Sequence, residues 1–174
     1  MRKLLSLLPV FVLVMSVAYA QGAAPAAGQT MVKGDVNAVW KCSAPEGQTQ
    51  LPVPGQANRA YSIFKGKCTA ASGTINGVKE KDGMFVEFSD ATATTAKGHG
   101  VFVETLVNGD TLTINYTTTG TMKDNMMLSG GNTWTIASGT GALKGIKGTG
   151  GCKGKGNPDG SGEFTCTGTY TIAK

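Results

Sequence analysis

The sequence predicts an all-β protein, a small eight-stranded antiparallel barrel stabilised by disulfide bonds. Three observations favour this fold class. Apolar and polar residues alternate in short stretches between turn signals, no helical period of any length separates them, and all 26 glycines follow residue 20. Strands with one apolar face must stack as two sheets or curl into a barrel, and closure also removes exposed edge strands. We therefore expect the closed barrel.

The first 20 residues have the pattern of a cleavable signal peptide. Arg2 and Lys3 precede an apolar run at residues 4–17, and Ala18 and Ala20 are the small residues that signal peptidase requires. The run is shorter than the ~20 residues that span a bilayer, and no cysteine for a lipid anchor lies near the cleavage site. The sequence predicts cleavage after Ala20 and a periplasmic or secreted protein without a transmembrane segment.

Beyond the signal peptide, the chain divides into a short tail and one domain. Residues 21–30 are small, polar or proline-containing and predict a flexible N-terminal tail. Residues 31–174 have the length of a single domain. Loss of Arg2 and Lys3 leaves 14 basic and 11 acidic residues, a net charge of +3. This mild charge, with no aromatic residues between the basic ones, argues against nucleic-acid binding.

Eight segments of the domain have the alternation of antiparallel strands. They are residues 32–42, 60–68, 84–89, 100–107, 111–119, 132–137, 146–155 and 162–173. Residues 43–58 contain three prolines and predict a long loop. Residues 120–131 predict a connection with unusually many methionines: a lid over the barrel mouth, a subunit contact, or a short apolar turn folded back on the core.

The turn at Asn157-Pro158-Asp159-Gly160 predicts the register of the last hairpin. Proline presets the second turn position, and glycine takes the left-handed conformation that closes a three-residue loop. If Asn157 faces Ser161, counting outward brings Cys152 opposite Cys166 in a non-hydrogen-bonded pair, close enough for a disulfide. In an oxidising compartment four cysteines form two disulfides, so elimination leaves Cys42 with Cys68.

Asn108-Gly109 predicts a second hairpin, with a two-residue type I′ turn. This turn places Val103 opposite Ile114 and Val101 opposite Tyr116, so that one face of both strands is apolar. Phe102 and Leu106 then lie on the other face, beside Glu104, Thr111, Thr113 and Asn115. As apolar exceptions on a polar face, they are expected to be covered by another element or a subunit.

The C-terminal third resembles a known superfamily. Trp134-Thr135-Ile136 precedes the glycine-rich residues 139–150, and a hairpin then ends in Gly168-Thr169-Tyr170. This order is similar to the C-terminal half of allene oxide cyclase barrel-like proteins, which include plant allene oxide cyclases, dirigent proteins and bacterial families of unknown function. The resemblance implies an eight-stranded barrel, often oligomeric, whose cavity in the plant members holds an apolar small molecule. No catalytic residue of the plant enzymes has a match here, so it implies no activity.

Other motifs do not point to chemistry. The glycine-rich run lacks the Gly-Lys-Ser/Thr of a phosphate loop and the spacing of a dinucleotide fingerprint. His99, the single histidine, lies between two glycines without a nucleophile motif and predicts a surface residue. No cysteines have zinc spacing, and no metal or cofactor is predicted. A basic cluster predicts solvent-exposed strand positions that discourage edge pairing: Lys144, Lys147, Lys153 and Lys155.

Two glutamates lie on predicted strands. Glu87 has the strand parity of Phe85, and Glu104 that of Phe102, so each points either away from the core or into a polar pocket. Paired carboxylates inside a barrel can act as acid and base, but the sequence does not bring these two together. We expect both to be exposed to solvent.

The absence of a catalytic signature favours a non-catalytic protein that binds a small apolar or amphipathic ligand. The candidate ligand-binding residues are Tyr116, Met122, Met126 and Met127. One alternative is an isomerase or cyclase acting on a hydrophobic small molecule. Another is a structural or interaction protein of the cell envelope, a homo-oligomer formed through Phe102, Leu106 and the loop around Met126.

Overall fold

The protein is a closed antiparallel β-barrel, described by a computed structural model at residues 30–124 and 126–173. The predicted signal peptide and almost all of the predicted tail lie outside these residues. The strands are β1 (Met31–Cys42), β2 (Glu46–Pro52), β3 (Ala60–Ser72), β4 (Thr74–Ile75), β5 (Val78–Ala91), β6 (Thr95–Leu106), β7 (Thr111–Lys123), β8 (Met126–Gly139), β9 (Lys147–Gly156) and β10 (Gly162–Ala173). A single 3₁₀ turn, η1 (Gly141–Leu143), is the only helical element in the described part of the chain.

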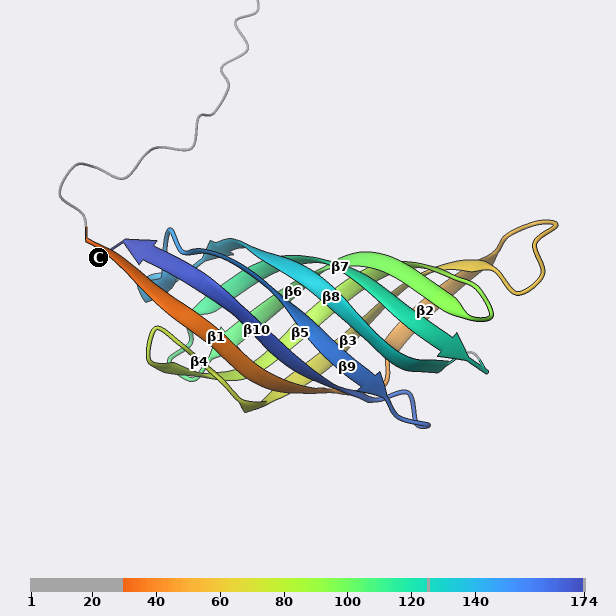
Figure 1. Ribbon diagram of the computed structural model, residues 1–174, viewed down its shortest axis with the longest axis horizontal. Helices are drawn as coiled ribbons and strands as arrows, with labels where there is room; N and C mark the ends of the chain where they lie inside the picture. The colour runs from red at the N-terminus through yellow and green to blue at the C-terminus, as the bar shows by residue number, and fades with distance from the viewer. Residues whose placement is uncertain (1–29, 125, 174) are drawn as a thin grey trace, which may run out of the picture.

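Eight long strands close the barrel, and two short ones extend its wall. The closed order is β1, β3, β5, β6, β7, β8, β9, β10 and back to β1, with every pair antiparallel. Figure 1 shows these strands tilted around an elongated barrel, with the start of β1 beside the end of β10. The predicted fold class and all eight predicted strands are confirmed, although most strands run further than their apolar cores.

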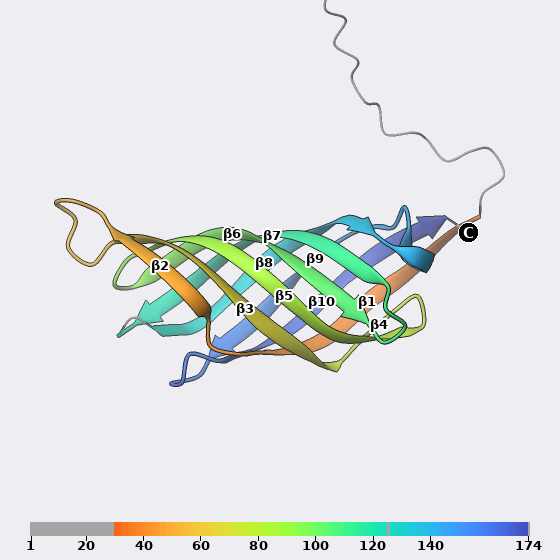
Figure 2. The ribbon, with the colours of Figure 1, turned by 180° about the vertical axis from the view of Figure 1, so that it is seen from behind.

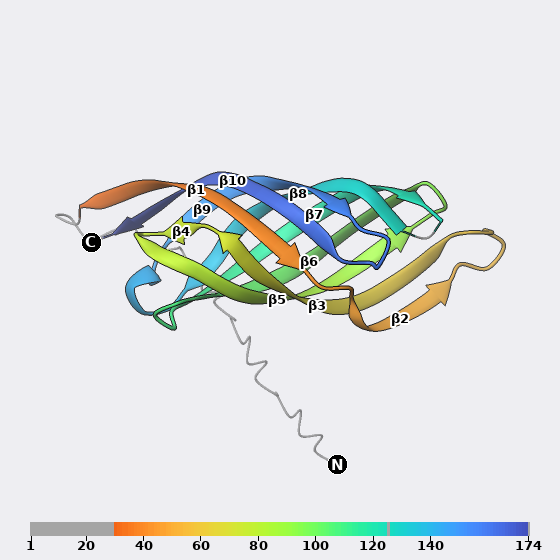
Figure 3. The same cartoon turned by 90° about the horizontal axis from the view of Figure 1, so that it is seen from below.

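The segment predicted as a long loop, residues 43–58, contains strand β2 instead. β2 pairs with the first half of β3, whose other side pairs with β5, so the three strands lie side by side (Figure 2). Figure 3 shows that the chain leaves β1, turns, and continues along β3 as β2. The sequence gives little sign of this strand because nearly all of its side chains are exposed and it has no apolar alternation.

The methionine-bearing connection at residues 120–131 is likewise strand rather than lid. β7 continues to Lys123 and β8 begins at Met126, and these two residues are paired in register. The prediction that this segment is a connection, as a lid or as a turn on the core, is therefore wrong. The long hairpin instead raises the barrel wall at one end, and it places Met122 opposite Met127.

The register of the last hairpin is as predicted. The N–H of Asn157 donates to the carbonyl of Ser161 at 2.8 Å, and Gly160 has a φ of 81°. Counting outward from this pair brings Cys152 opposite Cys166, and the two form a disulfide with Cα atoms 4.0 Å apart. Cys42 and Cys68, on β1 and β3, form the second disulfide at a Cα separation of 3.9 Å.

The predicted register of the β6–β7 hairpin is wrong by one residue. The N–H of Leu106 donates to the carbonyl of Asp110, and only Gly109 has a positive φ, so the loop has three residues, 107–109. Because side chains alternate along a strand, one extra loop residue exchanges the inner and outer faces of β6 relative to β7. Phe102 therefore pairs with Ile114 inside the barrel, and Leu106 is buried there. The predicted role of Phe102 and Leu106 as an oligomer contact is thereby corrected.

One end of the barrel is closed by an apolar core. The residues that form it come from the ends of several strands, from β4 and from the segment around η1. They are Val36, Ile75, Leu106, Leu112, Trp134, Ile136, Leu143, Ile146, Tyr170 and Ile172. Burial of this cluster closes the barrel at this end and leaves the interior accessible from the other.

Candidate ligand-binding cavity

A cavity of about 1160 Å³ extends from the open mouth of the barrel to the closed end. Its mouth is bordered by β2, by the segment 53–59 that follows it, and by the turn between β9 and β10. At its deep end it reaches Ile75, Leu112 and Ile136 of the apolar core. This volume is slightly above the ~300–1000 Å³ of typical ligand pockets, so the cavity has room for a small molecule.

Aromatic side chains form much of the wall of the cavity. They are Trp40, Phe64, Phe85, Phe102, Tyr116, Trp134 and Phe164. Several of these rings cover a glycine on the neighbouring strand, as Tyr116 covers Gly100 and Phe85 covers Gly66. A Cβ built on Gly100 would lie 2.6 Å from the ring of Tyr116. The inward-facing glycines therefore let the rings lie against the wall, which keeps the interior open.

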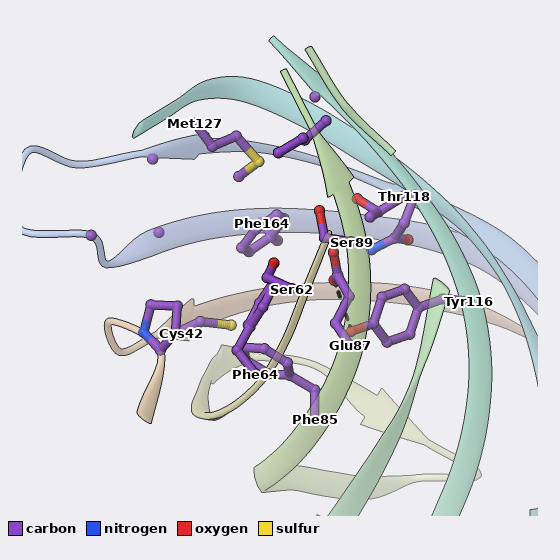
Figure 4. A pocket seen from close by; sticks show the side chains of 18 of the residues that line it. Cys42, Ser62, Phe64, Phe85, Glu87, Ser89, Tyr116, Thr118, Met127 and Phe164 are labelled. Carbon is purple, nitrogen blue, oxygen red and sulfur yellow. Dashed lines mark hydrogen bonds between the residues drawn. The ribbon is translucent and has the colours of Figure 1, made fainter. Parts of the chain in front are cut away.

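A hydrogen-bonded pair lies halfway along the cavity. Tyr116 of β7 donates its hydroxyl to Oε2 of Glu87 on β5 at 3.0 Å, across β6 (Figure 4). Gly98 of β6 leaves room for the carboxyl, because a Cβ there would lie 2.7 Å from Oε1 of Glu87. Burial raises the pKa of Glu87 to about 7, against the lowering effect of the hydrogen bond from Tyr116. A carboxyl with this pKa can hold or release a proton near neutral pH.

Two further carboxyls lie deeper in the cavity. Glu80 of β5 is 7% exposed and Glu104 of β6 is 3% exposed. Oε2 of Glu80 and Oε1 of Glu104 are buried and accept no hydrogen bond from the described residues. Burial, and then the charge of Glu80, raise the pKa of Glu104 to about 9, and burial raises that of Glu80 to about 7. The prediction that Glu87 and Glu104 are exposed to solvent is wrong, because the β6–β7 register turns Glu104 inward and Glu87 shares the inward parity of Phe85.

An ion pair between Arg59 and Asp90 lies at the mouth. Among residues 30–124 and 126–173, it is the only ion pair in which a residue of the cavity lining takes part. Arg59 donates from Nε to Oδ1 of Asp90 at 2.9 Å and from Nη2 to Oδ2 at 2.6 Å. The hydrogen bond from Arg59 lowers the pKa of Asp90. The guanidinium also lies 5.5 Å from the ring centre of Tyr61. Arg59 is thus held at the rim and its charge is already paired.

All four residues predicted to bind a ligand line the cavity. Tyr116 lies halfway down, and Met122, Met126 and Met127 lie near the mouth, from strands β7 and β8. Their contact with a ligand stays a prediction. Sequence reasoning missed Glu80, Trp40 and the phenylalanines. For Glu87 and Glu104 the signal was present, because each has the strand parity of a neighbouring phenylalanine.

His99 and the lysines of the basic cluster lie outside the cavity. His99 is exposed on the outer face, with its ring centre 5.4 Å from that of Phe88. The four lysines of the basic cluster are also exposed. Within the described ranges no three His, Cys, Asp or Glu side chains gather as a metal site requires. No helix there is both long enough and apolar enough to cross a bilayer.

The fold and the cavity define a small disulfide-bonded β-barrel with an interior open at one end. No protein-family model and no curated protein matches the sequence. Among solved structures, the chain is similar to a pterocarpan synthase dirigent protein at 13% identity and a TM-score of 0.47, over 91% of this chain and 100% of that one. It is also similar to a DUF3224 family protein of unknown function from Shewanella oneidensis, at 15% identity and a TM-score of 0.44, over 80% and 96%.

Proposed function

We propose that the protein is an exported barrel that binds a small apolar or amphipathic ligand in its cavity and catalyses no reaction. The observation that carries this proposal is the cavity itself, about 1160 Å³ in volume, with seven aromatic side chains and aliphatic residues such as Ile114 and Ile136 in its wall. The polar groups that line its interior include Glu80, Glu87, Glu104 and Tyr116. Apolar walls with few placed polar groups are the usual composition of a small-molecule site.

The methionines at the mouth support the same function. Met122 and Met127 lie opposite each other on β7 and β8 and line the cavity, and Met126 lines it beside them. Flexible thioether side chains adapt to irregular apolar surfaces. We propose that Met122, Met126 and Met127 contact the ligand at the mouth and that Tyr116 contacts it further inside.

Export and superfamily membership are part of the proposal. Two disulfides are typical of oxidising compartments, which supports a periplasmic or secreted location together with the N-terminal pattern of residues 1–20. The closed eight-stranded barrel and the glycine-rich residues 139–150 support assignment to the allene oxide cyclase barrel-like superfamily, as a bacterial exported member.

Mass spectrometry of the protein purified from the periplasm tests the binding function. A native spectrum is compared with a denaturing spectrum of the same sample. The proposal expects a stoichiometric small molecule in the native spectrum that is lost on denaturation. An empty chain that also fails to bind any of a panel of apolar probes would contradict it.

The Glu87–Tyr116 pair favours an isomerase or cyclase as the second candidate. A carboxyl with a pKa near 7, hydrogen-bonded inside an apolar cavity, has the properties of a general acid or base. The test incubates the ligand recovered from the native protein with wild type and with Glu87→Gln. Conversion to a product of equal mass by wild type alone would support catalysis, and an unchanged ligand would exclude it for that compound.

The homo-oligomer expected from the sequence, if it forms, requires a surface other than Phe102 and Leu106. Strands β3, β5 and β6 carry large apolar side chains on the outside as well as the inside: Ile63, Met84, Val86, Phe88, Val101 and Val103. Cross-strand pairs bring them together, as Ile63 with Phe88 and Val86 with Val101. Lys65 and Lys67 border this face on β3, opposite Val86 and Met84. An exposed apolar patch of this kind is typical of a subunit contact. We propose that it contacts a second copy, and a strict monomer in sedimentation at high concentration would contradict this.

A further inference from the structure

The charged groups inside the cavity are all of one sign. Three carboxyl side chains line it below the mouth, Glu80, Glu87 and Glu104. Among the described residues that line it, the one cationic side chain is Arg59, which lies at the rim and is paired with Asp90. No lysine contributes to the lining, although the chain without residues 1–20 carries a net charge of +3. The barrel is therefore basic outside and acidic inside.

The deepest carboxyls lack the hydrogen-bond donors that buried acceptors require. Oε2 of Glu80 and Oε1 of Glu104 have no partner among residues 30–124 and 126–173, and neither has Oδ1 of Asn132, which also lines the cavity. Buried acceptors without donors are rare in native proteins, because each costs the free energy of its lost hydration. The described residues therefore leave these acceptors without a hydrogen-bond donor.

The two carboxyls approach each other from neighbouring strands. Glu104 of β6 pairs in register with Gly83 of β5, and Glu80 pairs with Leu106, the next inward-facing position of β6, after an irregularity in β5 between Glu80 and Asp82. The two carboxyls are close enough for the charge of Glu80 to raise the pKa of Glu104. Phe102, two residues from Glu104 on the same face of β6, contacts Trp40 edge to face at a ring-centre distance of 5.0 Å. Aromatic faces attract cations, so rings and carboxyls together favour a positively charged group.

We propose that the ligand of this cavity is an amphipathic primary amine, whose ammonium group is bound by Glu80 and Glu104 and whose apolar body lies along the aromatic walls toward the mouth. This inference rests on the proposed binding function and specifies its ligand class. An ammonium group has three donors and no acceptor, which matches two carboxylates that lack donors. A metal ion fits less well, because no three acidic, His or Cys side chains gather among the described residues.

Binding of an amine at this site is expected to depend on pH. Burial raises the pKa of both Glu80 and Glu104, so the empty cavity holds protons that an ammonium ion must displace. The other titratable groups that face the interior are Glu87 and Tyr116, and the side chains below the pair are apolar, such as Ile75 and Leu112. Affinity for an amine should therefore rise from about pH 6 to about pH 9, below the ordinary amine pKa of ~10.

Fluorescence titration with three probes of equal chain length tests the inference. The probes are decylamine, decanol and decanoate, each kept below the concentration at which it forms micelles. Trp40 and Trp134, the two tryptophans of the chain, both line the cavity and report its occupation. At about pH 8 decylamine should bind at least about tenfold tighter than decanol, as expected for charge-assisted hydrogen bonds, and decanoate most weakly.

Variants locate the effect. Glu104→Gln should weaken decylamine about tenfold or more and leave decanol unchanged, whereas Glu163→Gln on the outer face should change neither. If Glu104→Gln does not fold, the amine inference is still tested by the wild-type protein, through its relative affinity for the three probes and the pH dependence of decylamine binding. Equal binding of decylamine and decanol would overturn the amine inference and leave the binding function standing. If none of the three probes binds, the proposed binding function itself is contradicted.

Discussion

Tyr116 donates a hydrogen bond of 3.0 Å to Glu87 across an intervening strand, inside a barrel whose outer surface carries most of the charge. The contact is geometrically feasible because β6 contributes glycines at positions 98 and 100, beside the carboxyl and the ring. A residue with a side chain at either position would displace one partner. The hydrogen bond between Glu87 and Tyr116 therefore also depends on the two glycines of β6, which contribute only the space beside it.

Replacing Tyr116 by phenylalanine should raise the pKa of Glu87 further above about 7. The hydrogen bond from Tyr116 favours the ionised carboxyl, and without it only the effect of burial remains. NMR titration of the side-chain carboxyl carbons measures this directly. Tyr61→Phe on the outer face is the matched control and should leave the titration of Glu87 unchanged. An unaltered Glu87 pKa in Tyr116→Phe would show that the hydrogen bond does not form in solution.

The stability of the empty protein should fall as the pH rises from about 4.5 to about 9. Unfolded glutamates titrate near 4.5, whereas burial raises the pKa of Glu80 and Glu87 to about 7 and that of Glu104 to about 9. In this interval the folded state binds more protons than the unfolded state, so the free energy of unfolding decreases with pH. Below it, both states are protonated and these groups have no effect.

Urea unfolding at a series of pH values measures this dependence. Glu104→Gln should flatten the decrease, because the amide does not ionise, while Glu163→Gln should retain the wild-type slope. A free energy of unfolding that rises steadily between about pH 5 and about pH 8 in wild type would contradict the raised pKa values.

Removal of the Cys152–Cys166 disulfide by serine substitution of both residues should lower the free energy of unfolding by about 2 to 4 kcal/mol, near the lower end. The bridge joins residues 14 apart, so it restricts the unfolded chain less than Cys42–Cys68, whose partners are 26 apart. On the chain-entropy account, removing the second bridge should cost about 0.5 kcal/mol more. Urea unfolding of the two double variants compares them. Four free thiols in the denatured, unreduced wild type would refute both bridges.

The register of the β6–β7 hairpin can be tested with two neighbouring residues. Phe102 faces the interior and Val103, 42% exposed, faces solvent. Phe102→Ala should therefore cost about 2 kcal/mol of stability, and Val103→Ala no more than about 0.5 kcal/mol. Thermal or urea unfolding of the two variants gives the comparison. The reverse order of effects is what a two-residue turn at Asn108-Gly109 would produce.

Local signals were sufficient for much of the fold. Apolar alternation located the eight long strands, and the Asn157-Pro158-Asp159-Gly160 turn set a register that brought Cys152 to Cys166. The two-residue turn predicted at Asn108-Gly109 was wrong, because glycine with a positive φ occurs in both two-residue and three-residue hairpin loops. The choice between them exchanges the inner and outer faces of β6, and it decided the position of Glu104.

The sequence by itself determined an all-β chain with paired cysteines, because strand period, turn chemistry and the register of one hairpin depend on residues close together in the chain. The tertiary structure alone decided that Glu80, Glu87 and Glu104 share one cavity with Tyr116. These residues come from β5, β6 and β7, and their side chains meet only once the barrel is closed and every strand has its register. Their burial, and hence their raised pKa values, are properties of that closed wall.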